Sequence, residues 1–319
     1  MKLTVLDPIY LNERHINRLK SFGQVAIHAN LPIREVELIQ RIKDSDIIIT
    51  ASSNLDKKII EQCKSLRLIS LACSGYNRIN VEACNKLGIM VTNVPSYATK
   101  AVAEHTFALL LSLMKKIREG DQLVRSGKFN QRNLSLSQLD GKVFGIIGTG
   151  RIGSRVAKIA NSLGCKVIAN TLHPSLRRAE KIKVKYVILT KLLRESDIIS
   201  LHVSLNPSTI NLISYNEFNL MREKPILINT SRGKVINHGA LVKALSKGKI
   251  SAAGLDVFLC EPPQKRDTLL KFSNVVFSPH HAFCTPEALE SCADVVTDNI
   301  ESFIKGKPKN IVNNPRPID

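Results

Sequence analysis

The chain has 319 residues, of which 44% are hydrophobic and 23% are charged. This length is enough for about two globular domains, each with its own core, and the composition excludes intrinsic disorder. The longest apolar run, residues 106–114, is too short to cross a bilayer, and the N-terminus has no signal-peptide core. We therefore expect a soluble, cytoplasmic protein with no membrane partner.

Lysine and arginine outnumber aspartate and glutamate by 46 to 27, which gives a formal net charge of +19. The basic residues are spread along the chain and aromatic residues make up only 5%, whereas nucleic-acid-binding proteins usually cluster both on one surface. No nucleic-acid partner is therefore expected, and the basic surface should attract anionic substrates. The seven cysteines contain no C-x-x-C pair, so neither a disulfide framework nor a metal site is predicted.

Short runs of β-branched residues alternate with helical stretches over the first 98 residues. Strands are predicted at residues 3–7, 24–29, 46–50, 66–72 and 89–94, with helices such as 33–43 and 55–65 between them. This alternation of strand and helix predicts a doubly wound parallel sheet.

A long apolar helix is predicted at residues 101–116, and a polar stretch, residues 125–141, follows it. A second series of about six strands then begins, with the sequences KVFGII, KVIAN, DIISLHV, PILINT, AAGLDV and NVVFSP. Continuous apolar runs of this kind are typical of parallel strands buried on both faces. One more helix is predicted from Pro286 to about Gly306, and it is expected to return to the first domain.

The strand KVFGII runs directly into Gly148-Thr149-Gly150-Arg151-Ile152-Gly153 and then into the helical sequence SRVAKIANSLG. In a strand-turn-helix of this kind, the first glycine permits a tight turn, the second lets a pyrophosphate approach the backbone, and the third lets the helix pack closely. The helix N-terminus also supplies unpaired N–H groups. The motif in this context predicts a dinucleotide-binding site.

The residue that bonds the adenine ribose in NAD-binding versions of this motif is acidic and lies about 20 positions further on. Here that place reads Asn170-Thr171-Leu172-His173, without a carboxylate. A 2′-phosphate could instead be met by Thr171, His173, Arg177 and Arg178. Alternatively, the two arginines could lie on a solvated helix face while NAD binds through a neutral ribose contact. The sequence leaves NAD and NADP both open.

Polar residues follow three later strands: Arg232 after ILINTS, Asp256 and Glu261 in AAGLDVFLCEPP, and His280 after NVVFSP. The carboxyl ends of parallel strands share one edge of a sheet, so these side chains can converge beside a nicotinamide. Arg232 is predicted to hold a carboxylate, His280 to exchange a proton with a hydroxyl or carbonyl oxygen, and Glu261 to orient the imidazole. Singly, each has a structural alternative as a loop cap, a surface charge or a buried histidine. Their occurrence together favours hydride-transfer chemistry.

Five segments carry a resemblance to one family: LDGKVFGIIGTGRIGSRVAK, INTSRGKVIN, GLDVFLCEPP, SPHHAFCTPEA and NVPSYATKAVAEHTFALLLSL. They are similar to the cofactor loop, the arginine, glutamate and histidine segments and the linker helix of the D-isomer-specific 2-hydroxyacid dehydrogenases. The resemblance implies an α/β protein with two doubly wound parallel-sheet domains, a Rossmann coenzyme domain inserted in a flavodoxin-like substrate domain, and an active site in the cleft. It places the substrate-binding domain at residues 1–98 and 287–319 and the NAD(P)-binding domain at residues 99–286.

The resemblance also assigns roles to individual positions. Arg232, Glu261 and His280 form the catalytic set: Arg232 binds the 2-oxo acid, His280 is the acid/base, and Glu261 supports it. Ser74 and Gly75 match the loop whose backbone N–H groups receive the substrate carboxylate, so the substrate contacts are Ser74, Gly75, Arg232 and His280. Cofactor contacts are implied for Thr106, Gly148, Gly150, Arg151, Ile152, Gly153, Thr171, His202, Thr230, Arg232, Asp256 and His280.

The activity that the resemblance implies is hydride transfer between NAD(P)H and a small 2-oxo acid, such as glyoxylate or hydroxypyruvate, to give a D-2-hydroxy acid, in a homodimer. Two departures from the family pattern are Thr171 and the segment HHAFCT, which is expected to reshape the substrate pocket. The chain ends at Asp319, before the extra regulatory domain of many phosphoglycerate dehydrogenases, so serine control is not expected. Two alternatives stay open: a nucleotide-sensing, corepressor-like regulatory protein on the same fold, and a formate- or phosphite-type dehydrogenase.

Overall fold

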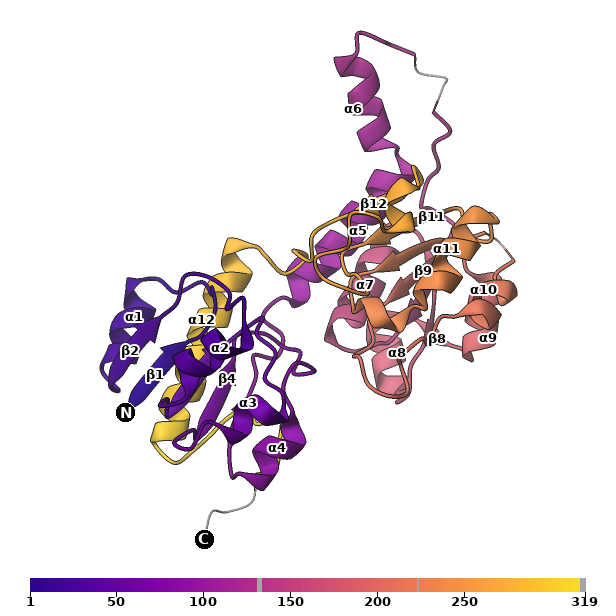
Figure 1. The fold of residues 1–319 in the computed structure, drawn as a ribbon. Coiled ribbons are helices and arrows are strands. Elements are labelled where there is room, and N and C mark those ends of the chain that lie inside the picture. The colour runs from indigo at the N-terminus through magenta and orange to yellow at the C-terminus, as the bar shows by residue number, and fades with distance from the viewer. Residues whose placement is uncertain (131–133, 223, 316–319) are drawn as a thin grey trace. The chain divides into compact units, whose positions relative to one another are not determined.

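The structure, a computed structural model, describes residues 1–130, 134–222 and 224–315. The chain divides into two compact units, residues 1–98 with 285–319 and residues 99–284, and each is described by itself (Figure 1). Within the described ranges, no helix combines the length and the apolar character needed to cross a membrane.

The first unit is built on a parallel sheet. In its described residues the strands are β1 (Lys2–Val5), β2 (Gln24–Ile27), β3 (Ile47–Thr50), β4 (Leu68–Leu71) and β5 (Met90–Thr92). Their order in the sheet is β2-β1-β3-β4-β5, and every neighbouring pair is parallel, which is the flavodoxin-like arrangement. All residues of β3 and β4 are buried, as is expected of mostly apolar strands between two helical layers.

Helices cover both faces of this sheet. One face packs against α1 (Glu13–Lys20) and α12 (Pro286–Ile304), and the other packs against α2 (Glu35–Ile42), α3 (Lys57–Glu61) and α4 (Val81–Lys86). Thr285 caps α12, because its side chain accepts the N–H of Ala288, and Pro286 occupies the first turn, where a missing N–H costs nothing. The last helix of the chain therefore completes the core of the first unit, with Val296 and Ile300 buried there.

The second unit is built on a larger parallel sheet. Its strands, in the described residues, are β6 (Val143–Ile147), β7 (Lys166–Asn170), β8 (Lys185–Tyr186), β9 (Ile198–Leu201), β10 (Ile226–Asn229), β11 (Ala252–Leu255) and β12 (Val275–Phe277). The order is β12-β11-β10-β9-β6-β7-β8, the Rossmann arrangement with one further strand. The sequence prediction of about six strands was one short, because the edge strand β8 has only two residues and shows no pattern.

Two helical layers sandwich this second sheet. On one face lie α5 (Thr99–Met114) and α7 (Arg151–Ser162), and on the other lie α9 (Leu189–Glu195), α10 (Tyr215–Leu220) and α11 (His238–Ser246). The short helix α8 (Leu176–Ile182) follows β7. The order of strands reverses between β6 and β9, so the carboxyl end of β6 lies at the kind of switch point where such sheets bind ligands.

One helix of the second unit lies outside these layers. None of the residues of α6 (Ile117–Arg125) is buried, and Figure 1 shows it extending away from the sheet of its own unit. The sequence prediction did not include this helix and marked only the polar stretch 125–141 that begins at its end. Residues 131–133 of that stretch lie outside the described residues.

Candidate active site

The glycine loop joins β6 to α7 in the conformation that the motif predicts. Gly148 has a φ of +95°, and a Cβ there would lie 2.6 Å from the carbonyl oxygen of His202. A Cβ at Gly153 would lie 1.9 Å from the carbonyl oxygen of Gly148, so the third glycine allows direct backbone contact. A Cβ at Gly150 would meet no described atom within 4 Å. The backbone at the N-terminus of α7 therefore faces open space, and the loop fits a dinucleotide pyrophosphate.

Several predicted cofactor contacts lie in this same unit. Thr106 of α5 and Thr230 after β10 are 124 residues apart in sequence, and their hydroxyl oxygens are 3.2 Å apart. The imidazole of His202, after β9, lies with Nε2 2.8 Å from Ser200 Oγ, and desolvation by burial lowers its pKa to about 3. His202 is therefore neutral near pH 7 and contributes its backbone to the wall of the glycine loop. Arg151 is exposed and Ile152 is half-buried in the first turn of α7.

The end of β7 lies beside the glycine loop. The N–H of Gly148 donates to the carbonyl oxygen of Asn170 at 2.8 Å. The side-chain amide of Asn170 in turn donates to the carbonyl oxygen of Val187 at 3.0 Å. Thr171 follows, half-buried, at the place where NAD-binding sites of this type carry an acidic residue.

Glu261 and His280 meet from two separate loops, one after β11 and one after β12. His280 Nδ1 lies 2.8 Å from Glu261 Oε2, and the side chains are 31% and 25% exposed. Glu261 Oε1 also accepts the backbone N–H of Phe258 at 3.2 Å, which orients the carboxylate. Because Nδ1 is engaged by the carboxylate, Nε2 is the ring nitrogen available to a small molecule. The structure therefore brings Glu261 and His280 into contact, and their acid/base role stays a prediction.

Asp256, buried at the end of β11, holds the backbone around His280. Its Oδ1 accepts the hydroxyl of Ser278 at 2.6 Å and the N–H of His281 at 3.0 Å, and its Oδ2 accepts the N–H of Ala282 at 3.1 Å. His280 lies among these contacts with a φ of +52°, a left-handed conformation that is costly for a residue with a side chain. The carboxylate therefore stabilises the strained residue that carries the imidazole. The predicted contact of Asp256 with the nicotinamide stays a prediction.

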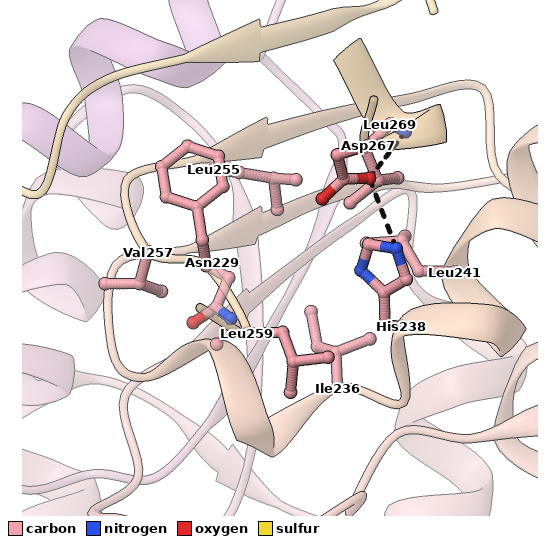
Figure 2. A pocket seen from close by; sticks show the side chains of 11 residues that line it. Asn229, Ile236, His238, Leu241, Leu255, Val257, Leu259, Asp267 and Leu269 are labelled. Atoms are coloured by element: carbon pink, nitrogen blue, oxygen red, sulfur yellow. Dashed lines mark hydrogen bonds and ion pairs between the residues drawn. The ribbon is translucent and has the colours of Figure 1, made fainter. Parts of the chain in front are cut away.

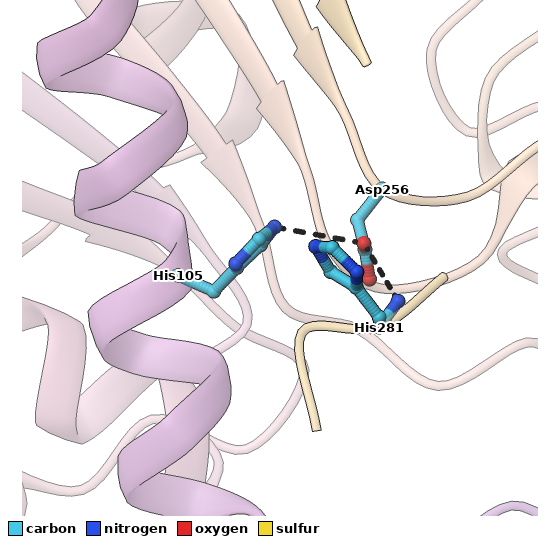
Figure 3. A group of neighbouring side chains, drawn as sticks. All are labelled: His105, Asp256 and His281. Atoms are coloured by element: carbon cyan, nitrogen blue, oxygen red, sulfur yellow. Dashed lines mark hydrogen bonds and ion pairs between the residues drawn. The ribbon is translucent and has the colours of Figure 1, made fainter. Parts of the chain in front are cut away.

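His105 of α5 extends this network, as Figure 3 shows. Its Nε2 lies 2.8 Å from Ser278 Oγ and 3.6 Å from Asp256 Oδ1, and its ring meets the ring of His281 edge-on with centroids 5.0 Å apart. Burial lowers the pKa of His105, the Asp256 carboxylate opposes that shift, and His281 adds to it. Sequence reasoning missed both His105 and Ser278, although a histidine inside an apolar helix was an available signal.

Arg232 follows β10 and precedes the short helix η1 (Gly233–Val235). Its carbonyl oxygen accepts the side-chain amide of Asn229 at 3.0 Å, and its Nη1 donates to the carbonyl oxygen of Ser231 at 2.7 Å. A Cβ at Gly233 would lie only 2.0 Å from the carbonyl oxygen of Phe258. The arginine segment and the segment that leads to Glu261 are therefore in direct backbone contact.

A cavity of about 20 Å³ lies next to this contact (Figure 2). Gly233, Phe258 and Leu259 contribute to its lining, and His238 Nε2 lies 3.2 Å from Asp267 Oδ1 in its wall. A volume of this size suits roughly one water molecule rather than a substrate. The cavity is therefore part of the packing behind the Glu261 segment.

Ser74 and Gly75 belong to the first unit, in the loop after β4. The hydroxyl of Ser74 donates to the carbonyl oxygen of Val94 at 2.7 Å, and the side-chain amide of Asn93 donates to the carbonyl oxygen of Ser74 at 2.7 Å. Within the described part of the chain, the backbone N–H groups of Ser74 and Gly75 have no protein acceptor. These two N–H groups are therefore available for an anionic ligand, and their contact with a substrate carboxylate stays a prediction.

Comparison with curated proteins finds close relatives along nearly the whole chain. A hydroxypyruvate reductase of Blautia hydrogenotrophica is 35% identical over 324 residues, which cover 98% of this chain and 100% of the relative. A glyoxylate reductase of Thermococcus litoralis is 38% identical, with 98% of this chain and 97% of the relative covered. A D-3-phosphoglycerate dehydrogenase of Archaeoglobus fulgidus is 36% identical over 99% of this chain but only 60% of its own length.

Solved structures of enzymes with a similar fold also match this chain over nearly its whole length. An acyclic imino acid reductase in complex with NADPH and D-Arg superposes with a TM-score of 0.90 at 34% identity, over 98% of this chain and 100% of that one. A D-lactate dehydrogenase of Aquifex aeolicus, complexed with NAD and lactic acid, has a TM-score of 0.88 at 29% identity, over 99% and 100% of the two chains. The model of the NAD binding domain of D-isomer specific 2-hydroxyacid dehydrogenases matches residues 107–282. The chain belongs to the D-isomer specific 2-hydroxyacid dehydrogenase family.

Proposed function

We propose that this protein reduces a small 2-oxo acid, such as glyoxylate or hydroxypyruvate, to the D-2-hydroxy acid with NADH or NADPH. The observation that carries the proposal is the 2.8 Å contact between Glu261 and His280 in the unit that holds the glycine loop. Relatives named glyoxylate reductase and hydroxypyruvate reductase, at 38% and 35% identity, support the substrate class. The protein is an oxidoreductase of this family, and its cofactor is a nicotinamide dinucleotide.

The roles of the side chains follow from their contacts. Reduced nicotinamide, when bound, supplies the hydride. His280 Nε2 donates a proton to the carbonyl oxygen of the substrate and accepts it again in the oxidation direction, because Nδ1 is held by Glu261. Glu261 orients the ring and stabilises the imidazolium. Arg232 binds the carboxylate of the 2-oxo acid through charge-assisted hydrogen bonds.

The two units have different roles in binding the cofactor and the substrate. The unit of residues 99–284 is the coenzyme domain, and the unit of residues 1–98 and 285–319 is the substrate-binding domain, a division two residues from the boundary expected at 286/287. Ser74 and Gly75 receive the substrate carboxylate with their backbone N–H groups. The cofactor contacts are Thr106, Gly148, Gly150, Arg151, Ile152, Gly153, Thr171, His202, Thr230, Arg232, Asp256 and His280.

The proposal is tested by following loss of reduced-nicotinamide absorbance with NADH and with NADPH. The substrates are glyoxylate, hydroxypyruvate, pyruvate and longer 2-oxo acids, and His280→Ala is the inactive control. Turnover of a small 2-oxo acid supports the proposal. Nucleotide binding without turnover of any pair contradicts it and favours the nucleotide-sensing alternative, whereas activity on formate or phosphite alone favours the third interpretation.

The same family resemblance leads us to propose a homodimer that uses α6. The side chains of Ile117 and Val124 on this helix are 61% exposed, and Phe129 just beyond it is 82% exposed. Ile117 and Val124 are seven positions apart, about two helical turns, so they share one face of α6 that a second copy of this chain would cover.

A further inference from the structure

We infer that the coenzyme site of this chain is built for a 2′-phosphate, so that NADPH is preferred over NADH. The inference rests on the proposed cofactor role of the glycine loop and concerns the residues that follow β7. Three features of that segment support it. The segment starts beside the glycine loop, it has no carboxylate at the ribose position, and its arginines have no acidic partner among the described residues.

The position is set by backbone contact between the two strands. The residues of β6 and β7 pair in parallel from Val143 to Ile147, and the N–H of Gly148 bonds the carbonyl oxygen of Asn170. The segment from Thr171 onward therefore starts beside the loop that receives the pyrophosphate. A ribose attached to that pyrophosphate has its 2′ position at the end of the second strand of the fold.

The residues at the end of β7 are uncharged, whereas NAD-binding sites of this type carry an acidic residue there. The side-chain amide of Asn170 donates one of its two N–H groups to the carbonyl oxygen of Val187 at 3.0 Å, which fixes the orientation of this uncharged side chain. Thr171, half-buried, presents a hydroxyl at the position of the missing carboxylate. A hydroxyl can donate to a phosphate oxygen, whereas a carboxylate would repel the phosphate.

The cations of the following helix lie close to this end. Arg178 Nη1 lies 3.5 Å from the carbonyl oxygen of His173, so the guanidinium folds back over the loop between β7 and α8. Ser175 fixes the first turn of that helix, because its hydroxyl accepts the N–H of Arg178 at 3.3 Å. The side chain of Arg178 is thus directed toward the segment that begins at Thr171.

These arginines have no acidic partner in the described residues. Arg177 and Arg178 are exposed and neither guanidinium pairs with a carboxylate there. From residue 166 to residue 185 the sequence has six lysines and arginines and a single acidic residue, Glu180. A 2′-phosphate carries about 1.5 to 2 negative charges near pH 7, so this segment would attract it.

The direct test compares binding of adenosine 2′,5′-bisphosphate and adenosine 5′-monophosphate to the full chain by titration calorimetry. These two probes differ only in the 2′-phosphate, and neither needs a 2-oxo acid. We expect the bisphosphate to bind roughly 10- to 100-fold more tightly, with the difference shrinking as salt is added. Equal binding, or tighter binding of the monophosphate, would overturn the inference.

Three variants locate the effect. Arg178→Gln should weaken bisphosphate binding about 10-fold and leave monophosphate binding unchanged. Thr171→Asp should remove the preference, because it restores a carboxylate at the ribose position. Lys181→Gln, which removes one charge from the far end of the same helix, should leave the ratio unchanged. Equal loss from Lys181→Gln and Arg178→Gln would mean that general surface charge, rather than a phosphate site, discriminates the probes.

The binding test separates this inference from the proposed reaction. If the bisphosphate binds more tightly but no 2-oxo acid is turned over, the result supports the 2′-phosphate site and refutes the proposed function. If turnover is faster with NADH and the two probes bind equally, the result refutes the 2′-phosphate site and supports the proposed reductase activity.

Discussion

Replacing Gly233 with alanine tests the backbone contact that joins the arginine segment to the glutamate segment. The new Cβ would lie 2.0 Å from the carbonyl oxygen of Phe258, 2.1 Å from its carbonyl carbon and 2.6 Å from the nitrogen of Leu259. Because a Cβ almost never comes closer than 3.0 Å to such atoms, the two segments must separate by about 1 Å. The N–H of Phe258 holds Glu261, which holds His280, so this displacement reaches the acid/base pair.

A displacement of about 1 Å at a reacting group can cost roughly 100-fold in rate, and overpacking costs about 1 to 3 kcal/mol of stability. For Gly233→Ala we therefore expect kcat to fall roughly 10- to 100-fold and the free energy of unfolding in urea to fall by about 1 to 3 kcal/mol. Gly120→Ala is the matched control, because its Cβ would lie 3.8 Å from Leu134 Cδ1, an ordinary contact. A Gly233→Ala enzyme with the stability and kcat of the parent would refute the reasoning.

Three further predictions concern other parts of the chain. His280→Ala should lower kcat by roughly 100- to 10,000-fold while nucleotide binding, measured by titration, stays nearly unchanged; normal turnover would contradict the acid/base assignment. The pKa of His202 is lowered to about 3, so the unfolded state binds more protons between that value and about pH 6.5, and stability is lost as pH falls through this window. Between pH 7 and pH 5 the parent should therefore lose up to about 2 kcal/mol more than His202→Gln in urea unfolding, and equal losses would contradict the burial of the neutral imidazole. Val124→Glu on α6 should shift the protein toward monomer in light scattering, whereas Gln122→Glu, which adds the same charge at a polar position, should not; a dimer that survives Val124→Glu would exclude this helix from the interface.

The parallel strands were predictable from the sequence because strands that are buried on both faces consist mostly of apolar residues. Every residue of β3, β4, β9 and β11 is buried, and each of these strands is mostly apolar, with at most one serine or threonine. The edge strand β8 was not predictable, since two residues carry no periodicity. The helix α6 was missed for a related reason: it has no buried residue, so nothing in the core constrains its pattern.

The sequence predicted candidate residues for the site, whose roles stay predictions, but it did not predict the contacts that hold them. Arg232, Glu261 and His280 each follow a strand, and the rule that strand ends share one edge predicted their common side of the sheet. The left-handed backbone of His280 depends on tertiary contacts, and so do the hydrogen bonds that Asp256 accepts from the N–H groups of His281 and Ala282. No local pattern encodes such contacts, so only the structure shows how the imidazole is held.

The path of the chain also determines when each core can form during synthesis. In the described residues, the two cores of the second unit draw on positions between 103 and 277, whereas the first unit buries Cys292, Val296 and Ile300 of α12 against its sheet. At about 5 to 20 residues per second, a ribosome needs roughly 10 to 40 s to make the intervening 99–284 segment. During that interval this face of the first sheet is covered by α1 but not yet by α12. The inserted unit can thus finish folding first, and the flanking unit closes its core only when the last helix emerges.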